Sequence, residues 1–209
     1  MGLFERKTTP VTIPLYSIGS EKTLLVVGLG NVGKTYALTR HNIGFMCLDH
    51  IAELNNLEWK EKKSLKCLLA ETKMGQSRVV FIKPTTLMNL SGDAVQAVRQ
   101  FYKIDLQDIV IVHDELAVPF GTIRVRKGGS DAGNNGIKSV TTAIGADYTR
   151  VRVGIKNDRL IKEDAAAFVL KNFSKEEQGY FKPLFAEANA LVTEFIFAGQ
   201  LPADTRKFI

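Results

Sequence analysis

Six short apolar runs recur along the chain, and each has the length of a β-strand that is covered on both faces. They lie at residues 24–27, 68–72, 79–82, 109–112, 123–125 and 151–155. Apolar residues repeat at helical spacing within residues 43–54 and 94–102. Strands that alternate with helices predict an α/β fold, a single domain of three layers. A mixed, largely parallel twisted sheet would lie between flanking helices, and a site would form at the carboxyl ends of its strands.

Two further segments carry local signals. Ser174 and Glu177 have the spacing of a capping box, which predicts that one long amphipathic helix opens there and continues through residue 196. Residues 127–136, "KGGSDAGNNG", form a loop rich in glycine and asparagine between a predicted strand and a helix. Long loops in compact domains often have a functional role, so we expect this loop to cover part of a site.

The segment "GLGNVGKT" at residues 28–35 matches two phosphate-binding patterns, that of dinucleotide-binding folds and that of P-loop NTPases. Both patterns need a helix that starts at the loop, but apolar periodicity begins only at Ile43, and the residues after Lys34 show no apolar stripe. In favour of an NTPase, "IVIVHDE" at residues 109–115 resembles a strand that ends in a metal-binding acid. A P-loop NTPase that uses Lys34 and Thr35 therefore stays open as an alternative.

The composition bounds the class of protein. The 209 residues, 45% of them hydrophobic, suffice for one domain with a core of ordinary size. We expect residues 23–209 to form this domain and residues 1–22 to be a loosely ordered N-terminal extension. The chain has no apolar run of about 18 residues for a membrane span and no secretory signal. Cys47 and Cys67 are expected to be buried free thiols, which favours a cytoplasmic protein. The net charge of +6 fits an anionic partner such as RNA.

Polar residues gather where the predicted strands end. His41 and Asn42 precede the first predicted helix, and Asp114 follows a strand. Three carboxamides lie at other strand ends or in the glycine-rich loop: Asn31, Asn89 and Asn135. Histidine can take a proton from water near neutral pH, a carboxylate can fix its tautomer, and carboxamides can bind a peptide backbone. No serine or cysteine stands in a nucleophile elbow and no metal-ligand spacing occurs, so the set favours hydrolysis by activated water without metal or cofactor.

Four separated blocks of the sequence are similar to one known family. They are "VGLGNVGKTYALTRHNIGF", "KPTTLMNLSGDAV", "HDELAVPFGTIRVRKGGSDAGNNGIKS" and "RVRVGI", and they occur in the family's order. From about residue 24 to residue 199, the chain resembles the bacterial-type peptidyl-tRNA hydrolases. The resemblance implies a cofactor-free, monomeric enzyme that cleaves the ester bond between a peptide and the ribose of tRNA, releasing the peptide and recyclable tRNA.

The resemblance also implies roles for individual residues. His41 would be the general base for the attacking water, Asp114 would orient and stabilise it, and Asn31 would bind the peptide. Asn89 and Asn135 would hold the substrate near the scissile ester, and Leu87 and Met88 would line the same pocket. Tyr36 would contact the CCA end of the tRNA acceptor stem. Arg126 and Arg152 match positions that clamp the 5′-phosphate of the tRNA. The alternative is that these arginines lie on a solvated strand edge, where their charge prevents the strand from pairing with another chain.

Several positions depart from the family pattern. Val32 replaces a proline in the first block, and Leu87 stands where an aromatic residue often precedes "MN". Asn134 replaces the histidine that usually precedes the substrate-binding asparagine, Asn135, although an amide can still donate a hydrogen bond. These departures keep a second alternative open, a non-catalytic RNA-binding relative of the same fold.

Overall fold

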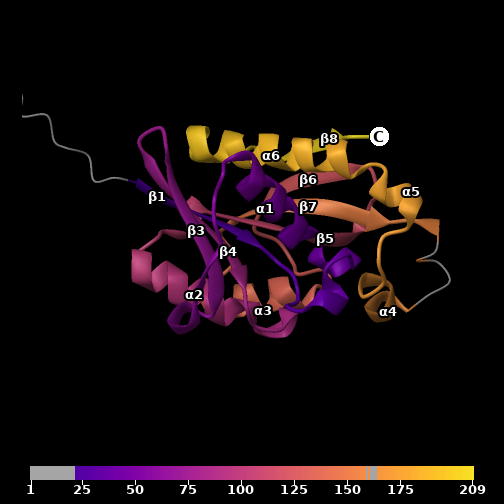
Figure 1. Cartoon of the computed structure of the whole chain (residues 1–209), viewed down its shortest axis with the longest axis horizontal. Coiled ribbons are helices and arrows are strands. Elements are labelled where there is room, and N and C mark those ends of the chain that lie inside the picture. The colour runs from indigo at the N-terminus through magenta and orange to yellow at the C-terminus, as the bar shows by residue number, and fades with distance from the viewer. Residues whose placement is uncertain (1–21, 159, 161–163) are drawn as a thin grey trace, which may run out of the picture.

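The computed structural model describes residues 22–158, 160 and 164–209 (Figure 1). Its strands are β1 (Lys22–Gly28), β2 (Lys60–Lys62), β3 (Cys67–Met74), β4 (Ser77–Pro84), β5 (Ile109–Pro119), β6 (Thr122–Lys127), β7 (Thr149–Lys156) and β8 (Asp204–Lys207). Its α-helices are α1 (Ile43–Leu54), α2 (Ser91–Tyr102), α3 (Asn135–Ile144), α4 (Ala165–Val169), α5 (Lys175–Gln178) and α6 (Phe181–Ala198). The predicted N-terminal extension lies outside the described residues, except for Lys22, which is the first residue of β1.

One mixed sheet forms the centre of the molecule. In the described part of the chain it has eight strands, in the order β2-β3-β4-β1-β5-β7-β6-β8. The central strands β4, β1, β5 and β7 pair in parallel, whereas β3 and β6 run in the opposite direction to all the others. All six strands that the apolar runs predict are present. The predicted fold class is confirmed, and the carboxyl ends of the four central strands meet at one end of the sheet.

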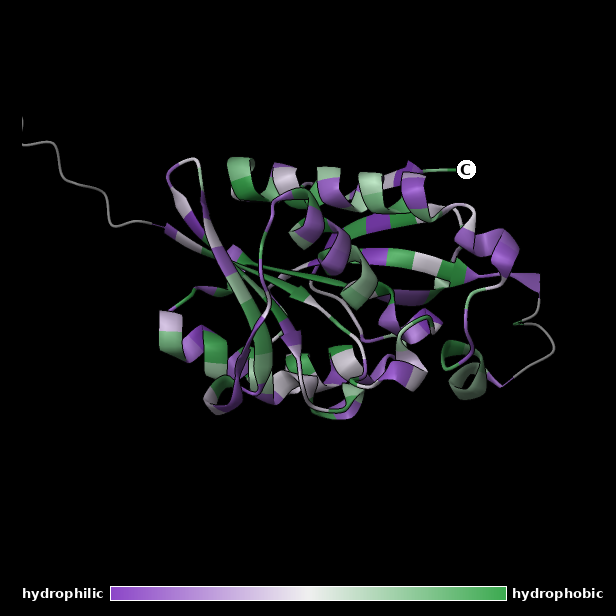
Figure 2. Cartoon of the chain, viewed as in Figure 1, coloured by the Kyte–Doolittle hydropathy of each residue, from purple (hydrophilic) through white to green (hydrophobic). Residues whose placement is uncertain are grey.

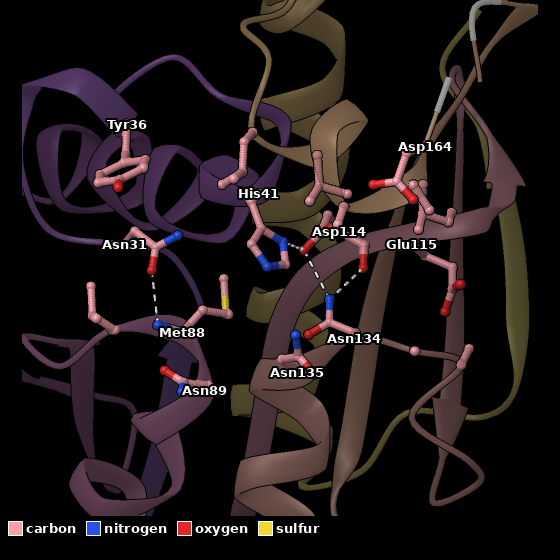
Figure 3. Close-up of a pocket in the computed structure, with 18 residues that line it drawn as sticks. Asn31, Tyr36, His41, Met88, Asn89, Asp114, Glu115, Asn134, Asn135 and Asp164 are labelled. Carbon is pink, nitrogen blue, oxygen red and sulfur yellow. Dashed lines mark hydrogen bonds and ion pairs between the residues drawn. The ribbon is translucent and has the colours of Figure 1, made fainter. Parts of the chain in front are cut away.

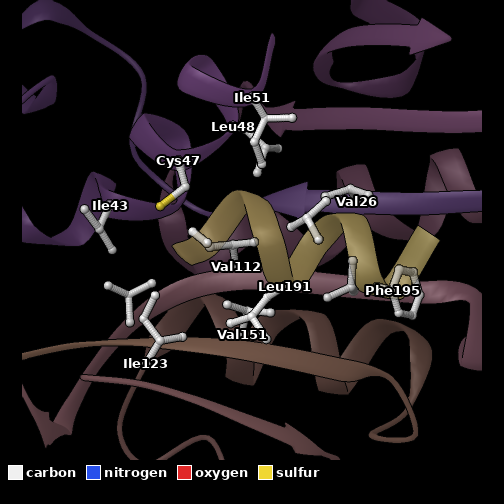
Figure 4. Packing of buried hydrophobic residues seen from close by; sticks show 14 of the residues in the cluster. Val26, Ile43, Cys47, Leu48, Ile51, Val112, Ile123, Val151, Leu191 and Phe195 are labelled. Atoms are coloured by element: carbon white, nitrogen blue, oxygen red, sulfur yellow. The ribbon is translucent and has the colours of Figure 1, made fainter. Parts of the chain in front are cut away.

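Helices cover both faces of the sheet. Helices α1 and α6 lie on one face, and α2 and α3 lie on the other (Figure 1). Successive strand residues point to opposite faces, so Leu24 and Val26 pack with α1 and α6, while Leu25 and Val27 pack with α2 and α3. Figure 4 shows Val26 in the first of these clusters. The central strands are largely hydrophobic, and the helices alternate between hydrophobic and hydrophilic residues (Figure 2). Within the described ranges, none of the helices combines the length and apolar character that a membrane crossing needs.

The two cysteines are buried free thiols, as predicted. Cys47 belongs to the cluster under α1 and α6, and Cys67 belongs to the cluster under α2 and α3. Burial raises the pKa of both thiols, that of Cys67 to about 12. Because the thiolate is the reactive form, neither cysteine is a nucleophile near neutral pH.

Helix α1 is pressed against the ends of β1 and β5, and glycine makes this close approach possible. A Cβ atom on Gly44 would lie 2.3 Å from the carbonyl oxygen of Val112, and one on Gly28 would lie 2.5 Å from the carbonyl oxygen of Gly44. Both distances are far below van der Waals contact, so no side chain fits at either glycine. The 3₁₀ turn η2 (Arg40–Asn42), which carries His41, directly precedes α1 and is therefore held at the carboxyl ends of the central strands.

Two features differ from the sequence predictions. The capping box is present, but the single long helix predicted from residue 174 to residue 196 is wrong, because it is divided into α5 and α6. Pro183 has no amide hydrogen, and its ring would clash with the carbonyl of Gly179 in a continuous helix, so the chain breaks at Gly179 and Tyr180. Strands β2 and β8 were not predicted, because they are short polar edge strands without an apolar run.

Candidate active site

A pocket of about 570 Å³ opens at the carboxyl ends of the central strands (Figure 3). It is lined by Asn31, Tyr36, His41, Leu87, Met88, Asn89, Asp114, Glu115, Leu116, Ala132, Gly133, Asn134, Asn135, Asp164, Ala165, Ala166, Val169 and Leu170. Eight of the ten predicted site residues line this pocket, and Arg126 and Arg152 do not. Within the described residues, no group of three or more His, Cys, Asp or Glu side chains is placed to hold a metal ion.

His41 and Asp114 form the central pair of the pocket. Nδ1 of His41 lies 2.9 Å from Oδ1 of Asp114, and both side chains are buried. An ionised carboxylate only accepts hydrogen bonds, so Nδ1 is the donor, and Nε2, on the side of the ring away from Asp114, keeps its lone pair (Figure 3). Burial by itself lowers the pKa of His41, but the charge of Asp114 and its hydrogen bond outweigh burial, so the pKa lies above the ordinary 6.5. The pair is arranged to take up a proton at Nε2.

Asp114 has a second side-chain partner, Asn134, for which the sequence predicted no role beyond a departure from the family pattern. Nδ2 of Asn134 donates to Oδ1 of Asp114 at 2.9 Å and to the backbone carbonyl of Asp114 at 3.2 Å. Asn134 is also the N-cap of α3. The available sequence signal was an asparagine directly before a predicted helix, because asparagine is a favoured N-cap residue.

Asn31 is held so that one end of its side chain is turned toward the pocket. Its Oδ1 accepts a hydrogen bond from the backbone amide of Met88 at 2.8 Å, which orients the carboxamide and makes Nδ2 the end available to a ligand. Asn42 clamps the backbone of Asn31: the Asn42 Oδ1 accepts from the Asn31 amide at 2.8 Å, and its Nδ2 donates to the Asn31 carbonyl at 2.9 Å. Asn42 is therefore a positioning residue. It belongs to the polar residues noted before the first predicted helix, but the sequence predicted no role for it.

The other predicted substrate-binding residues form the mouth of the pocket. Leu87, Met88 and Asn89 come from the turn after β4, and Asn135 is the first residue of α3. Asn89 and Asn135 are exposed, as is Leu87, whereas Met88 is buried below them. Tyr36 is half-buried on the side of Asn31 (Figure 3). The mouth therefore presents two carboxamides, an aromatic ring and an aliphatic side chain to a ligand.

Lys34 and Thr35 do not form a P-loop. They lie in the 3₁₀ turn η1 (Lys34–Tyr36), and α1 begins only at Ile43. A P-loop lysine needs the first turn of an α-helix, whose amide groups bind phosphate. Both residues are exposed, and neither lines the pocket. The NTPase interpretation is therefore wrong for this chain, and the glycine spacing is explained by the close approach of α1 and by a turn at Gly33, whose φ is 114°.

Four arginines lie on one face of β6 and β7. Arg124 stands opposite Arg152, and Arg126 stands opposite Arg150, in the antiparallel pair, so all four side chains share a face. Arg152 donates to Glu115 at 2.9 Å, and the Glu115 side chain lines the pocket. Arg150 is buried against carbonyls of the glycine-rich loop, whereas Arg124 and Arg126 are exposed. Like charges directly opposite one another repel, and a bound anion would relieve this repulsion.

Helix α4 forms a further wall of the pocket, which the sequence did not predict. Arg40, the residue before His41, fixes the position of α4 through contacts of its buried side chain. Its guanidinium donates to two backbone carbonyls that follow α4, lies 4.4 Å from the ring centroid of Phe168, and pairs with Glu177 at 2.8 Å. The turn that carries His41 and the segment that carries α4 are therefore joined through one buried cation.

Replacement of Arg40 by methionine is expected to lower the free energy of unfolding by about 3–5 kcal/mol. The Glu177 side chain is only 10% exposed, and its carboxylate would remain there without a cation. Urea unfolding measures the difference. The double variant Arg40→Met, Glu177→Gln is the control, and it should recover part of the loss because no buried charge is left unpaired. A single variant as stable as the wild type would contradict the anchoring role.

A histidine–carboxylate pair in a carboxamide-lined pocket, at the carboxyl ends of a mixed α/β sheet, is a kind of site that suits a hydrolase. The family model described as peptidyl-tRNA hydrolase matches residues 25–208. The chain therefore belongs to the peptidyl-tRNA hydrolase family, as the sequence predicted.

Individual relatives agree with the family model. A peptidyl-tRNA hydrolase of Frankia casuarinae is 43% identical over 183 residues, which cover 87% of this chain and 92% of the relative. A second, of Aliarcobacter butzleri, is 46% identical over 153 residues, 73% of this chain and 81% of the relative. The crystal structure of peptidyl-tRNA hydrolase from Acinetobacter baumannii matches with a TM-score of 0.79 at 32% identity, covering 87% of this chain and 93% of that one.

Proposed function

We propose that the chain is an active peptidyl-tRNA hydrolase, in which water cleaves the ester between a peptide and the terminal ribose of tRNA. The observation that carries this proposal is the buried His41–Asp114 pair, which leaves the Nε2 lone pair of His41 at the wall of a pocket lined by carboxamides. The reaction needs only water, a base and donors for the carbonyl oxygen, and the pocket residues can supply the base and the donors.

His41 is the general base of the proposed mechanism. A water molecule in the pocket gives a proton to Nε2 while its oxygen attacks the ester carbonyl carbon, and Asp114 stabilises the imidazolium that forms. When the tetrahedral intermediate collapses, the bond to the ribose oxygen breaks, and the imidazolium returns its proton to that oxygen. The products are a peptide with a free carboxyl group and a tRNA with a free ribose hydroxyl, so atoms and protons balance.

The carboxamides position the substrate. Asn31 binds the peptide through Nδ2, a role supported by the fixed orientation of its amide against Met88. Asn89 and Asn135, at the mouth, hold the substrate near the scissile ester. Tyr36, Leu87 and Met88 contact the CCA end. Groups that are already oriented before the substrate arrives lose little freedom on binding, which lowers the barrier to reaction.

The acceptor stem of the tRNA binds beside the pocket. The 5′ end of a tRNA is paired next to its 3′ extension, so an ester held in the pocket brings the 5′-phosphate to a neighbouring surface. The arginine face of β6 and β7 is suited to this phosphate, with Arg126 and Arg152 as the clamp. Support comes from the opposed arginine pairs and from the contact of Arg152 with Glu115, which links that face to the pocket.

Replacement of Arg126 by alanine is expected to raise the KM for a 5′-phosphorylated N-acetylaminoacyl-tRNA about tenfold, or about 1.4 kcal/mol, with kcat little changed. The effect should nearly disappear with a substrate that carries a 5′-hydroxyl. The slope of log KM against log salt should also decrease by about one. Lys60→Ala removes the same charge from the exposed edge strand β2, at the other end of the sheet order, and serves as the control. An equal effect in both variants would refute a specific phosphate contact.

The same proposal includes the organisation of the chain. Residues 23–209 act as the hydrolase domain, and the enzyme acts as a monomer, as the resemblance to the family implies. Its substrate arises during translation, which favours the cytoplasm. The deciding assay compares N-acetylated with unblocked aminoacyl-tRNA, and the wild type should cleave the blocked substrate in preference. Tight tRNA binding without any cleavage would instead identify an RNA-binding relative that is not an enzyme.

A further inference from the structure

We propose that Asn134 is a positioning residue that holds Asp114, and through it the imidazole of His41, by joining the Asp114 side chain to the N-terminus of α3. This inference rests on the proposed function, and it extends the machinery to a residue that acts through Asp114. Its basis is the complete set of hydrogen bonds made by one carboxamide.

The side chain of Asn134 is engaged at both ends. Its Oδ1 accepts from the backbone amides of Gly136 at 3.0 Å and Ile137 at 3.1 Å. These two donors decide which end of the amide is oxygen, because a flipped amide would set N–H groups against N–H groups. Nδ2 therefore faces Asp114, where its two hydrogens match two acceptors, Oδ1 at 2.9 Å and the backbone carbonyl at 3.2 Å.

The result is a fixed carboxylate at Asp114. Its Oδ1 accepts from Nδ1 of His41 and from Nδ2 of Asn134, each at 2.9 Å, so rotation of the carboxylate would break both bonds (Figure 3). The N-terminus of α3 contributes partial positive charge from the same side. A carboxylate held in this way keeps His41 in the tautomer whose Nε2 can accept a proton.

The amide supports Asp114 in a manner that does not depend on pH, unlike the histidine that is usual at this position in the family, which gains a charge near neutrality. Other titratable groups face Asp114 or the pocket. His113 donates from Nδ1 to the backbone carbonyl of Asp114 at 2.7 Å, and burial lowers its pKa to about 4, so it stays neutral. Glu115 is paired with Arg152, and Asp164 caps α4. The side chain that holds the Asp114 carboxylate is therefore an uncharged amide, and it bonds the carboxylate directly.

Replacement of Asn134 by serine separates its contact with Asp114 from its role as the N-cap of α3. A serine hydroxyl caps a helix about as well as asparagine does, so α3 should keep its cap, but serine is too short to reach Asp114. We expect kcat for an N-acetylaminoacyl-tRNA to fall about 10- to 100-fold, with little change in KM and Tm. Asp131→Ser is the matched control, because Asp131 accepts from the Gly133 amide in the same loop and lies outside the pocket lining. This control should keep the wild-type kcat.

Replacement of Asn134 by aspartate gives an independent readout. Aspartate keeps the size of the side chain and the cap, but it sets a second carboxylate against Asp114. The added negative charge favours the imidazolium of His41, so the acid limb of kcat/KM should move to higher pH. If Asn134→Ser lowers the Tm strongly, its loss of kcat could come from unfolding, and the shift of the acid limb in Asn134→Asp then tests the proposal instead.

Three results would overturn the proposal. They are an Asn134→Ser enzyme with the wild-type kcat, an equal loss of kcat in Asp131→Ser, and an unmoved acid limb in Asn134→Asp. A wild type that binds tRNA without cleaving it would overturn the function on which the proposal rests, and this outcome is recognised before any variant is made.

Discussion

Replacing His41 with alanine is expected to lower kcat for cleavage of an N-acetylaminoacyl-tRNA by about 10²–10⁴-fold. The methyl group of alanine cannot accept the proton that the attacking water must lose, and the described residues that line the pocket include no other histidine. The Kd for tRNA should stay close to that of the wild type, because the arginine face of β6 and β7 is untouched. Single-turnover cleavage and equilibrium binding of the same tRNA measure the two effects separately.

Lys34→Ala is the control for this experiment. Lys34 lies only seven residues before His41, is exposed and does not line the pocket, so its loss should leave kcat largely intact. A wild-type kcat in His41→Ala would remove His41 from its role as base. A loss in Lys34→Ala as large as that in His41→Ala would mean that the phosphate-loop pattern has a chemical role after all.

The pH dependence of kcat/KM is a second test of His41 as the general base. Protonated His41 has no lone pair on Nε2, so kcat/KM of the wild type should fall as the pH drops through the pKa of His41. Asp114 raises that pKa above the ordinary 6.5, so the acid limb should lie above 6.5 as well. The limb should be absent from the residual activity of His41→Ala.

The core of the fold could be predicted because its signals are local. Each buried strand is a continuous apolar run, since both of its faces are covered by helices. Strands β2 and β8 escaped prediction for the opposite reason: their residues are polar and depend on pairing with one neighbour at a sheet edge. Pro183 is a sequence signal for the break between α5 and α6. The apolar periodicity continues without interruption across this break, and it therefore predicted a single helix.

In the site, the functional residues near strand ends could be predicted from the sequence. The contacts that hold these residues in position could not. His41 and Asp114 are 73 residues apart in sequence, yet each lies near the carboxyl end of a central strand, and the fold class itself brings such positions together. The clamp of Asn42 on the Asn31 backbone and the buried pair of Arg40 with Glu177, 137 residues apart, follow only from the details of packing. No periodicity or motif in one sequence encodes them.

Replacement of Asp114 by asparagine is expected to lower kcat by about 10²–10³-fold without unfolding the protein, since the two side chains have nearly the same volume. Nδ1 of His41 and Nδ2 of Asn134 share one oxygen of Asp114, so the oxygen of the new amide keeps that place, accepts from both, and leaves the tautomer of His41 unchanged. The variant removes the negative charge that stabilises the imidazolium formed when Nε2 takes a proton from water.

The charge of Asp114 is lost in the same variant, and burial then lowers the pKa of His41 instead of being outweighed. The residual activity of Asp114→Asn should therefore keep its acid limb at a lower pH than the wild type, while kcat at every pH stays far below it. A kcat that is reduced at every pH, with its limb at lower pH, would show that the negative charge of Asp114 both raises the pKa of His41 and stabilises the imidazolium during the reaction. A kcat within about tenfold of the wild type, with an unmoved limb, would show that this charge does not support the base.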